Sequence, residues 1–313
     1  MIRLAIRRLL LAVPLLLVVS LLTYVLTSLA PGNAAETILG SSATPAAVAS
    51  LERQLGLTDP VWVQYWHWLS KALTGNLGTS LTSYQAVGAE LSARLPVTLS
   101  LVIVGTLVST ALGVSLGMVS ALRGGVVGRA IDALAMLGFS VPNFWLGLVL
   151  VDLLAVKVHL LPATGYVNIS QNPLEWARFL VLPVATLAAV GLTGIAKQTR
   201  DSLLEVMGRE FITALRADGI AEWRIVLRHG LRNAAIPVVT SVGVFFIGML
   251  GGTVLVESVF VMPGLGSEAV SSAQSGDLTT LQGIVVVFCI IVVVVNLLVD
   301  LLYGWLDPRA RVS

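Results

Sequence analysis

The segment Lys197–Asn233 reads KQTRDSLLEVMGREFITALRADGIAEWRIVLRHGLRN and lies between two long apolar segments. It holds seven of the chain's 19 lysine and arginine residues. Apolar residues recur at helical steps on both sides of Gly219: Leu204, Met207, Phe211 and Leu215 before it, and Trp223, Leu227, Gly230, Leu231 and Ala234 after it. Because glycine readily adopts the left-handed conformation that ends helices, this pattern predicts a helix–turn–helix with basic outer faces. Two interpretations are open: an ordinary basic loop, or a docking element for a partner that pushes on it.

The composition indicates a membrane protein. The chain has 313 residues, of which 56% are hydrophobic and 12% charged, and its mean hydropathy is +0.92. Soluble domains carry about 25% charged residues. The 29 glycines fit close packing of transmembrane helices, and the single cysteine, Cys289, excludes an intrachain disulfide.

Six uncharged runs each reach the roughly 17–25 residues that cross a bilayer core. They are Leu9–Ala35, Leu95–Leu122, Ala133–Val151, Phe179–Ala196, Asn233–Val256 and Leu278–Val299. The first run is longer than the apolar core of a signal peptide, so we interpret it as an uncleaved helix. Pro142 and Pro183 fall inside predicted helices, where proline removes a backbone hydrogen bond and bends the helix. We predict an all-α polytopic membrane protein with six transmembrane helices.

The predicted segments follow from these runs. Residues 1–30 form a cytoplasmic N-terminus with the first helix, residues 31–96 an external helical segment, residues 97–306 a transmembrane core, and residues 307–313 a cytoplasmic tail. Within the core, transmembrane helices are predicted at 97–121, 133–152, 179–196, 234–257 and 278–302, and the charged segment occupies 197–233. With a cytoplasmic N-terminus, the cytoplasmic segments hold 14 lysine and arginine residues and the external segments five. This asymmetry predicts that both termini are cytoplasmic.

The external segment 31–96 has helix signals of its own. Thr44 is a candidate N-cap before Pro45, and Gly56 is a candidate helix end. A second helix opens at Pro60 and stops at Gly75. It carries an aromatic stripe that suits a membrane surface: Trp62, Tyr65, Trp66 and Leu69. The segment is either a lid packed on the outer helix ends or a landing surface for an external partner.

Motifs for catalysis and metal binding are missing from the sequence. It has no HExxH zinc motif and no GxSxG elbow. The stretch GLTGIAKQT at Gly191–Thr199 lacks the glycine that precedes the lysine of a phosphate-binding loop, and the three histidines are scattered over three segments. These observations argue against a membrane enzyme and predict no metal site.

The predicted spans also lack an ion site. The acidic residues nearest the spans lie at their ends: Asp132, Asp152, Glu257 and Asp300. A secondary carrier coupled to protons or ions needs ionisable groups inside its spans. We therefore expect a conduit whose energy comes from another protein, and the charged segment is the large cytoplasmic surface that would receive it.

Four stretches, in this order and spacing, resemble a known family across the whole chain. They are Arg7–Leu11 through Leu29–Gly32; Leu55–Pro60 with Gln64–Leu69, Gly75–Ser80 and Arg94–Pro96; Arg216–His229 through Leu231–Pro237; and Glu257–Gly266 with Leu298–Tyr303 and Leu306–Arg309. The chain resembles the membrane permeases of bacterial binding-protein-dependent ABC importers of the dipeptide, oligopeptide and nickel type. It is most similar to the B subunit of dipeptide importers. The resemblance implies the type I ABC importer permease fold and a multi-pass protein of the bacterial cell membrane.

The resemblance also implies a role for the charged segment. It matches the family's coupling loop, whose helix sits in a groove of the cytoplasmic ATPase. The implied ATPase contacts are Ala214, Leu215, Arg216, Ala217, Asp218, Gly219, Ile220, Ala221, Glu222, Trp223, Arg224 and Arg228. The family's Glu-Ala-Ala triplet reads Thr213-Ala214-Leu215 here, and its later Leu-Pro reads Leu231-Arg232.

Two external surfaces are further candidates. The stretch after the fifth span is a simple extracellular turn or part of an outer gate, with Glu257, Phe260, Pro263, Gly264 and Gly266 as gate candidates and a tight turn at Pro263–Gly266. Its solvated acids Glu257, Glu268 and Asp277 would suit the amino terminus of a peptide. Candidate contacts to an external binding protein are Trp62, Tyr65, Trp66 and Asn76.

The resemblance implies a set of partners. They are a sister permease, two cytoplasmic nucleotide-binding ATPase units, an extracytoplasmic substrate-binding protein, membrane lipids and a peptide substrate, with no nucleic acid. The chain is not an enzyme and carries no cofactor, because ATP and Mg²⁺ are bound by the ATPase units. Nickel or another small ligand is the alternative cargo, and an ion-coupled secondary transporter is the alternative class.

Overall fold

The structure is a computed structural model that describes residues 2–29, 34–40 and 43–306. The predicted tail at 307–313 and the predicted boundary at residues 30–31 lie outside this part. The described chain is helical, with an isolated β-bridge between Thr79 and Ala86. It forms two compact units. The core unit is Leu99–Met262 with the chain from Val294 onward, and the N-terminal unit is Ile2–Thr98 with Pro263–Val293.

Five helices in the described part of the chain are long and apolar enough to cross a membrane. They are Leu10–Ser28 within α1 (Ile2–Ser28), α5 (Val87–Arg123), α8 (Pro173–Met207), the continuous helix Glu222–Val259 that ends in α11 (Leu231–Val259), and Leu278–Gly304 within α13 (Leu278–Leu306). The all-helical polytopic fold is therefore confirmed at this level. The helices extend past the predicted spans, so that the first eleven residues of the charged segment belong to α8.

The predicted third span is not one continuous helix. α6 (Gly125–Ser140) ends before Val141, whose backbone is extended (φ −89°, ψ 125°). α7 (Asn143–Leu150) begins after Pro142 and continues as a π-helix over Val151–Lys157. Proline disfavours helical geometry at the residue before it, which explains the break at Val141. Pro183, by contrast, lies inside the uninterrupted α8.

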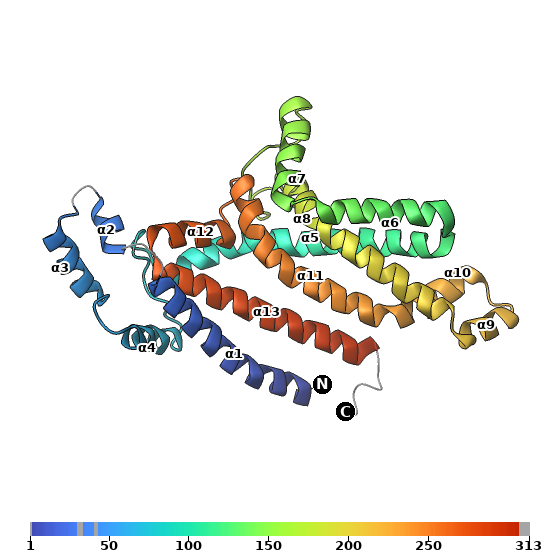
Figure 1. The fold of residues 1–313 in the computed structure, drawn as a ribbon, viewed down its shortest axis with the longest axis horizontal. Helices are drawn as coiled ribbons and strands as arrows, with labels where there is room; N and C mark the ends of the chain where they lie inside the picture. Colours follow the sequence, from blue (N-terminus) through green and yellow to red (C-terminus); the bar gives the residue numbers. More distant parts are fainter. Residues whose placement is uncertain (1, 30–33, 41–42, 307–313) are drawn as a thin grey trace. The chain divides into compact units, whose positions relative to one another are not determined.

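The core unit is organised around α8, which packs against α6, α7 and α11. Of the most apolar 18-residue window of α8, 61% is buried, against 28% for the α11 helix. Glycines mark the close contacts: a Cβ on Gly113 of α5 would lie 2.9 Å from the Ile195 side chain, and one on Gly194 would overlap the Phe245 ring. Small residues at such positions let helix backbones approach closely. Figure 1 shows α8 running from α7 at one end to α9 at the other.

The N-terminal unit holds two apolar clusters. Tyr24 of α1 packs against Tyr65 and Trp68 of α4 (Val61–Ala72). The second cluster joins α5, α12 (Leu265–Ser275) and α13 through Val87, Leu91, Leu265 and Ile284. α2 (Ala34–Leu39) and α3 (Pro45–Leu55) complete the unit.

The caps of α3 are confirmed. The Thr44 side chain accepts a hydrogen bond from the Ala47 amide (3.3 Å), Pro45 is the first helical residue, and Gly56 ends the helix with φ +69°. α4 begins after Pro60, as predicted, and its last helical residue is Ala72. Gly75 terminates it as predicted: its φ is +84°, its amide donates to the Ala72 carbonyl (2.9 Å), and the Asn76 amide donates to the Lys71 carbonyl (3.0 Å).

Candidate functional site

α8 ends at Met207, inside the charged segment, and a second, short helix follows. The Gly208 amide donates to the carbonyls of Leu204 and Glu205, and α9 then runs over Glu210–Ala217. Ile212 is the fully buried residue of α9. Glu210 in the first turn of α9 is favourable because helix N-termini attract negative charge.

Gly219 ends α9 in the way that the sequence predicted. Its φ is +75°. The Gly219 amide donates to the Arg216 carbonyl (3.0 Å), and the Ile220 amide donates to the Leu215 carbonyl (3.2 Å). This pair of bonds is the Schellman arrangement, in which a left-handed residue satisfies the last carbonyls of a helix. The turn is thus fixed by the backbone itself.

An ion pair closes the same turn from outside. Arg216 donates from Nε to Glu222 Oε2 (3.1 Å) and from its terminal nitrogen to Oε1 (2.7 Å). The hydrogen bond to Glu222 raises the pKa of Arg216 above its ordinary value. Next to this pair, the Arg224 guanidinium lies 5.2 Å from the centroid of the Trp223 ring. The fork geometry of arginine ties α9 to α10 (Glu222–Arg224).

Beneath the turn lies a buried base. α10 continues as a π-helix, Ile225–Gly230, into α11. Ile225 and Val226 of this π-helix are buried, as is Ile212 of α9. Most of the predicted coupling residues are exposed above this base, and Leu215 and Ile220 are half-buried. Ala214–Arg224 therefore forms an outward-facing knob on a fixed support, which we call the coupling knob.

The predicted apolar faces of this segment are wrong in detail. Leu204 and Met207 lie on α8, whereas Phe211 and Leu215 lie on α9, so Gly208 divides the stripe. Trp223 is 62% exposed and Leu227 is 50% exposed. Gly230 and Ala234 of the predicted stripe are buried, whereas the base under the turn is formed by Ile212, Ile225 and Val226, which the pattern did not include. Helical spacing identified the helices but not their buried sides.

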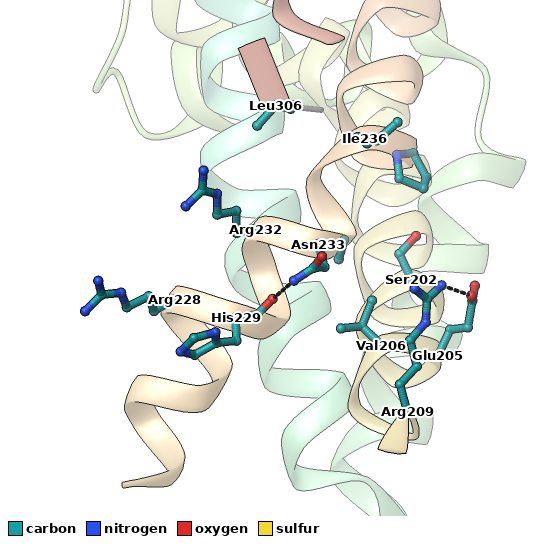
Figure 2. A pocket seen from close by; sticks show the side chains of 12 residues that line it. Ser202, Glu205, Val206, Arg209, Arg228, His229, Arg232, Asn233, Ile236 and Leu306 are labelled. Carbon is teal, nitrogen blue, oxygen red and sulfur yellow. Dashed lines mark hydrogen bonds and ion pairs between the residues drawn. The ribbon is translucent and has the colours of Figure 1, made fainter. Parts of the chain in front are cut away.

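A polar pocket of about 840 Å³ lies beside the knob. The end of α8 contributes Glu205 and Arg209, which form an ion pair at 2.7 Å. The start of α11 and the preceding π-helix contribute Arg228, His229 and Arg232. Figure 2 shows the Arg228 and Arg232 side chains extending to the same side, away from α8. Arg228 therefore shares a surface with Arg232, which was not among the predicted contact residues.

At the opposite end of α11, the gate candidates of the core unit are inside the protein. Glu257 is 0% exposed and Phe260 is buried. The Phe260 carbonyl accepts a hydrogen bond from the Gly165 amide (2.9 Å). Between two buried residues, Phe260 and Met262, the exposed Val261 has φ +50°. This conformation is rare for a β-branched residue and costs energy, which makes the position a candidate for function.

The remaining gate candidates lie in the N-terminal unit. Gly264 is the N-cap of α12, and Gly266 lies in its first turn. The predicted tight turn at Pro263–Gly266 is thus the start of a helix. The backbone amide of Leu265 donates to the Thr98 hydroxyl (2.8 Å), which ties α12 to α5.

The acids of this region are not solvated, contrary to the prediction. Asp277 is buried and accepts hydrogen bonds from the hydroxyls of Ser80 (2.5 Å) and Thr280 (3.0 Å). Glu268 pairs with Arg94 at 2.7 Å. Burial raises the pKa of Glu268 above its ordinary value, and the positive charge of Arg94 opposes this shift. These carboxylates bind Ser80, Thr280 and Arg94 within the N-terminal unit and are not free to receive a peptide.

The aromatic stripe of α4 divides into two sides. Trp62 is 72% exposed and Trp66 is 65% exposed. Tyr65 is buried, and its hydroxyl lies 2.8 Å from the Ser20 hydroxyl of α1. Asn76 is exposed, and its side-chain oxygen accepts from the Gly78 amide (2.9 Å). Of the predicted contact residues, Tyr65 thus packs inward, while the two tryptophans and Asn76 face outward.

No group of three or more His, Cys, Asp or Glu residues in the described ranges 2–29, 34–40 and 43–306 is arranged to hold a metal ion.

Comparison with known proteins places this geometry in context. Residues 113–312 match the family described as "Binding-protein-dependent transport system inner membrane component", and residues 1–102 match the corresponding N-terminal family. The chain is 38% identical to the "Probable peptide ABC transporter permease protein y4tP" of Sinorhizobium fredii, over 97% of this chain and 98% of that protein. It is 36% identical to the dipeptide transport system permease protein DppB of Alkalihalophilus pseudofirmus, over 98% of each chain.

The fold is also found among solved structures. An inward-facing structure of the MetNI methionine ABC transporter aligns with a TM-score of 0.58 at 19% identity. The alignment covers 70% of this chain and 96% of the other. At 19% identity, this alignment shows a similar fold and nothing more.

Proposed function

The chain belongs to the family of inner-membrane components of binding-protein-dependent transport systems, and from this premise we propose that it forms, with a sister permease, the translocation pathway of an ATP-driven importer of small peptides. It is a multi-pass permease subunit of the bacterial inner membrane and not itself an ATPase. The peptide cargo is supported by the names of its relatives, one a peptide and one a dipeptide transport permease. Nickel or another small ligand is the alternative cargo within this family.

The single observation that carries the proposal is the coupling knob. Its turn is fixed twice, by the Gly219 backbone bonds and by the Arg216–Glu222 ion pair, and its exposed residues sit on a buried base. Such a knob moves as one body with the helices on both sides of it. We place it in a groove of a cytoplasmic ATPase unit, so that ATP-driven movement of that unit displaces α8 and α11. ATP and Mg²⁺ are held by the two ATPase units.

The membrane orientation that we propose follows from charge. Both termini and the coupling knob are cytoplasmic, because lysine and arginine concentrate in those segments. The broken pair α6–α7 makes the third of six crossings. The end of α11 at Glu257–Val261 then faces the outside, together with the external segment 31–96.

We assign the external contacts to two places. Trp62 and Trp66, one helical turn apart and exposed on α4, face a substrate-binding protein together with Asn76. Exposed aromatic side chains of this kind are frequent anchors of protein interfaces. The strained stretch around Phe260 and Val261, with Glu257 behind it, contributes to the outer gate. In the N-terminal unit, Pro263, Gly264 and Gly266, where α12 begins, are further gate candidates.

The test is transport by the reconstituted importer. Proteoliposomes containing this chain, its sister permease and the ATPase units are supplied with the binding protein and a radiolabelled dipeptide. We expect uptake that requires both ATP and the binding protein. Nickel uptake without peptide uptake would show that the cargo is nickel and not peptide. Uptake by this chain alone in a proton gradient would overturn the assignment as an ATP-driven importer.

A further inference from the structure

An apolar groove of about 460 Å³ lies in the core unit between α5, α11 and α13. It is lined by side chains such as Val114, Val239, Phe246, Leu298 and Leu302. The hydroxyl of Thr110 is the one side-chain polar atom of this lining, and the lining residues all lie in the described range 43–306. The groove therefore has the chemistry of a hydrocarbon binding site.

Two arginines continue the same side of α11 beyond the groove. Val239 lies seven residues, about two helical turns, after Arg232, and Phe246 lies seven residues after Val239. Arg228 precedes Arg232 by four residues, about one turn. Figure 2 shows both arginine side chains extending away from α8, on one side of the helix. The apolar groove and the two guanidiniums thus follow one another along a single helix face.

These guanidiniums are available to a ligand. Neither Arg228 nor Arg232 forms an ion pair or hydrogen bond through its side chain with any residue of the described part of the chain, and both are exposed. Arg209, at the other wall of the polar pocket, is by contrast paired with Glu205. Guanidinium groups bind phosphate oxygens in paired, charge-assisted hydrogen bonds. Two unpaired arginines one turn apart therefore suit a phosphate group.

We propose that this face binds an anionic glycerophospholipid, with an acyl chain in the groove and the phosphate between Arg228 and Arg232. Basic pockets between transmembrane helices on the cytoplasmic side commonly bind anionic lipid headgroups. With the orientation proposed above, the arginines lie at the level of the cytoplasmic leaflet. An apolar groove next to the charges favours a lipid over a free phosphate ion. It also favours a lipid over acidic side chains of the ATPase, because Leu231 and Ala235, which flank Arg232, line the groove.

The proposal also predicts selectivity among lipids. A zwitterionic lipid carries an ammonium group that repels the arginines, whereas phosphatidylglycerol carries none. Each basic side chain near an anionic lipid surface contributes about fivefold in affinity. Loss of both arginines should therefore weaken binding of phosphatidylglycerol by about tenfold or more.

The experiment titrates the purified full-length chain in detergent with dioleoylphosphatidylglycerol, dioleoylphosphatidylcholine or glycerol 3-phosphate, and counts bound molecules by native mass spectrometry. The main variant is Arg228→Gln/Arg232→Gln. The charge-matched control is Arg123→Gln/Lys197→Gln, two exposed basic residues outside the groove. Val239→Trp fills the groove without changing any charge. Arg232→Gln alone serves if the double variant does not fold.

We expect the wild type and the control to prefer phosphatidylglycerol over phosphatidylcholine. We expect the arginine variant to lose that preference, and Val239→Trp to bind both lipids weakly. Equal binding of the two lipids by the wild type, or an equal loss in the control, would overturn the proposal. So would glycerol 3-phosphate bound as tightly as the lipid, which would indicate a site for a soluble anion. An unchanged preference for phosphatidylglycerol in the arginine variant would also overturn it.

Discussion

Replacing Gly219 by valine tests whether the coupling knob transmits force. A Cβ at Gly219 would meet no atom within 4 Å, so the substitution causes no clash. Its cost is the backbone conformation alone, because φ is +75° there. A side-chain-bearing residue in this conformation costs about 1–3 kcal/mol, and a β-branched residue lies at the upper end. That cost shifts the ratio of formed to unformed turn by a factor of roughly 5 to 150.

The assay measures ATP hydrolysis and peptide uptake in the same proteoliposomes. In Gly219→Val we expect ATP hydrolysis to persist while uptake per ATP falls by about tenfold or more, because the knob yields when the ATPase moves. The substitutions should rank Gly, Asn, Ala, Val in decreasing uptake per ATP, since asparagine tolerates the left-handed conformation better than alanine. Membrane insertion should be unchanged throughout the series.

The matched control is Gly56→Val. Gly56 ends α3 with φ +69°, and its amide and that of Leu57 donate to Arg53 and Glu52, the same arrangement as at Gly219. The backbone cost is therefore similar, but the position lies in the N-terminal unit. If Gly219→Val transported with normal uptake per ATP, or if Gly56→Val uncoupled equally, the assignment of the knob would be refuted.

Three further predictions concern contacts within one unit or the other. Arg216→Glu and Glu222→Arg should each lower uptake per ATP by about twofold to fivefold, because exposed ion pairs are weak, and the double exchange should restore it in the same liposome assay. Asp277→Asn should destabilise the protein by about 2–4 kcal/mol in thermal melts, because the buried carboxylate loses its charge-assisted hydrogen bonds. It should also speed amide hydrogen exchange in the segment after α4, and unchanged exchange would contradict this prediction. Gly194→Ala should cost about 1–3 kcal/mol by overlap with Phe245, and adding Phe245→Leu should recover part of the loss in the melting temperature.

Local backbone signals in the sequence were reliable because each depends on one or two residues. Thr44, Pro45 and Gly56 mark the ends of α3 where they were predicted. Gly219 adopts the left-handed conformation expected of it. Such residues act through their own allowed conformations and hydrogen bonds, so distant parts of the chain cannot override them easily.

Hydropathy predicted the five long apolar helices that the described part of the chain contains, but it could not predict the shape of the remaining predicted span. An uncharged run of the right length was read as a single crossing at 133–152, yet the structure has two helices there, α6 and α7, and a π-helix. The proline at 142 was noted, but a proline can bend a helix or end it. Pro183 lies within α8, whereas Pro142 separates two helices. Neighbouring helices decide between these outcomes, and a single sequence does not contain that information.

The acidic residues near the outer ends were read as solvated because polar residues usually are. Asp277 is instead the buried acceptor for a segment nearly two hundred positions earlier, beginning with Ser80. Its partners are neutral hydroxyls and amides, which leave no charge pattern in the sequence. Complementary charge would have been a readable signal, as at Arg94 and Glu268, but hydrogen bonds to neutral groups are not.

Several residues of the predicted apolar faces are exposed, and this exposure supports the proposed docking role of the charged segment. Inside a membrane, an apolar side chain is stable whether it faces lipid or protein, so helical spacing does not identify the buried side; close glycines such as Gly113 and Gly194 do so better. The coupling knob follows the last turn of α8, and there Phe211, Trp223 and Leu227 are exposed. Exposed apolar groups clustered on a soluble surface mark contacts with another protein. Under the coupling role proposed above, we expect these exposed apolar side chains in and beside the knob to contribute to its contact with the ATPase unit.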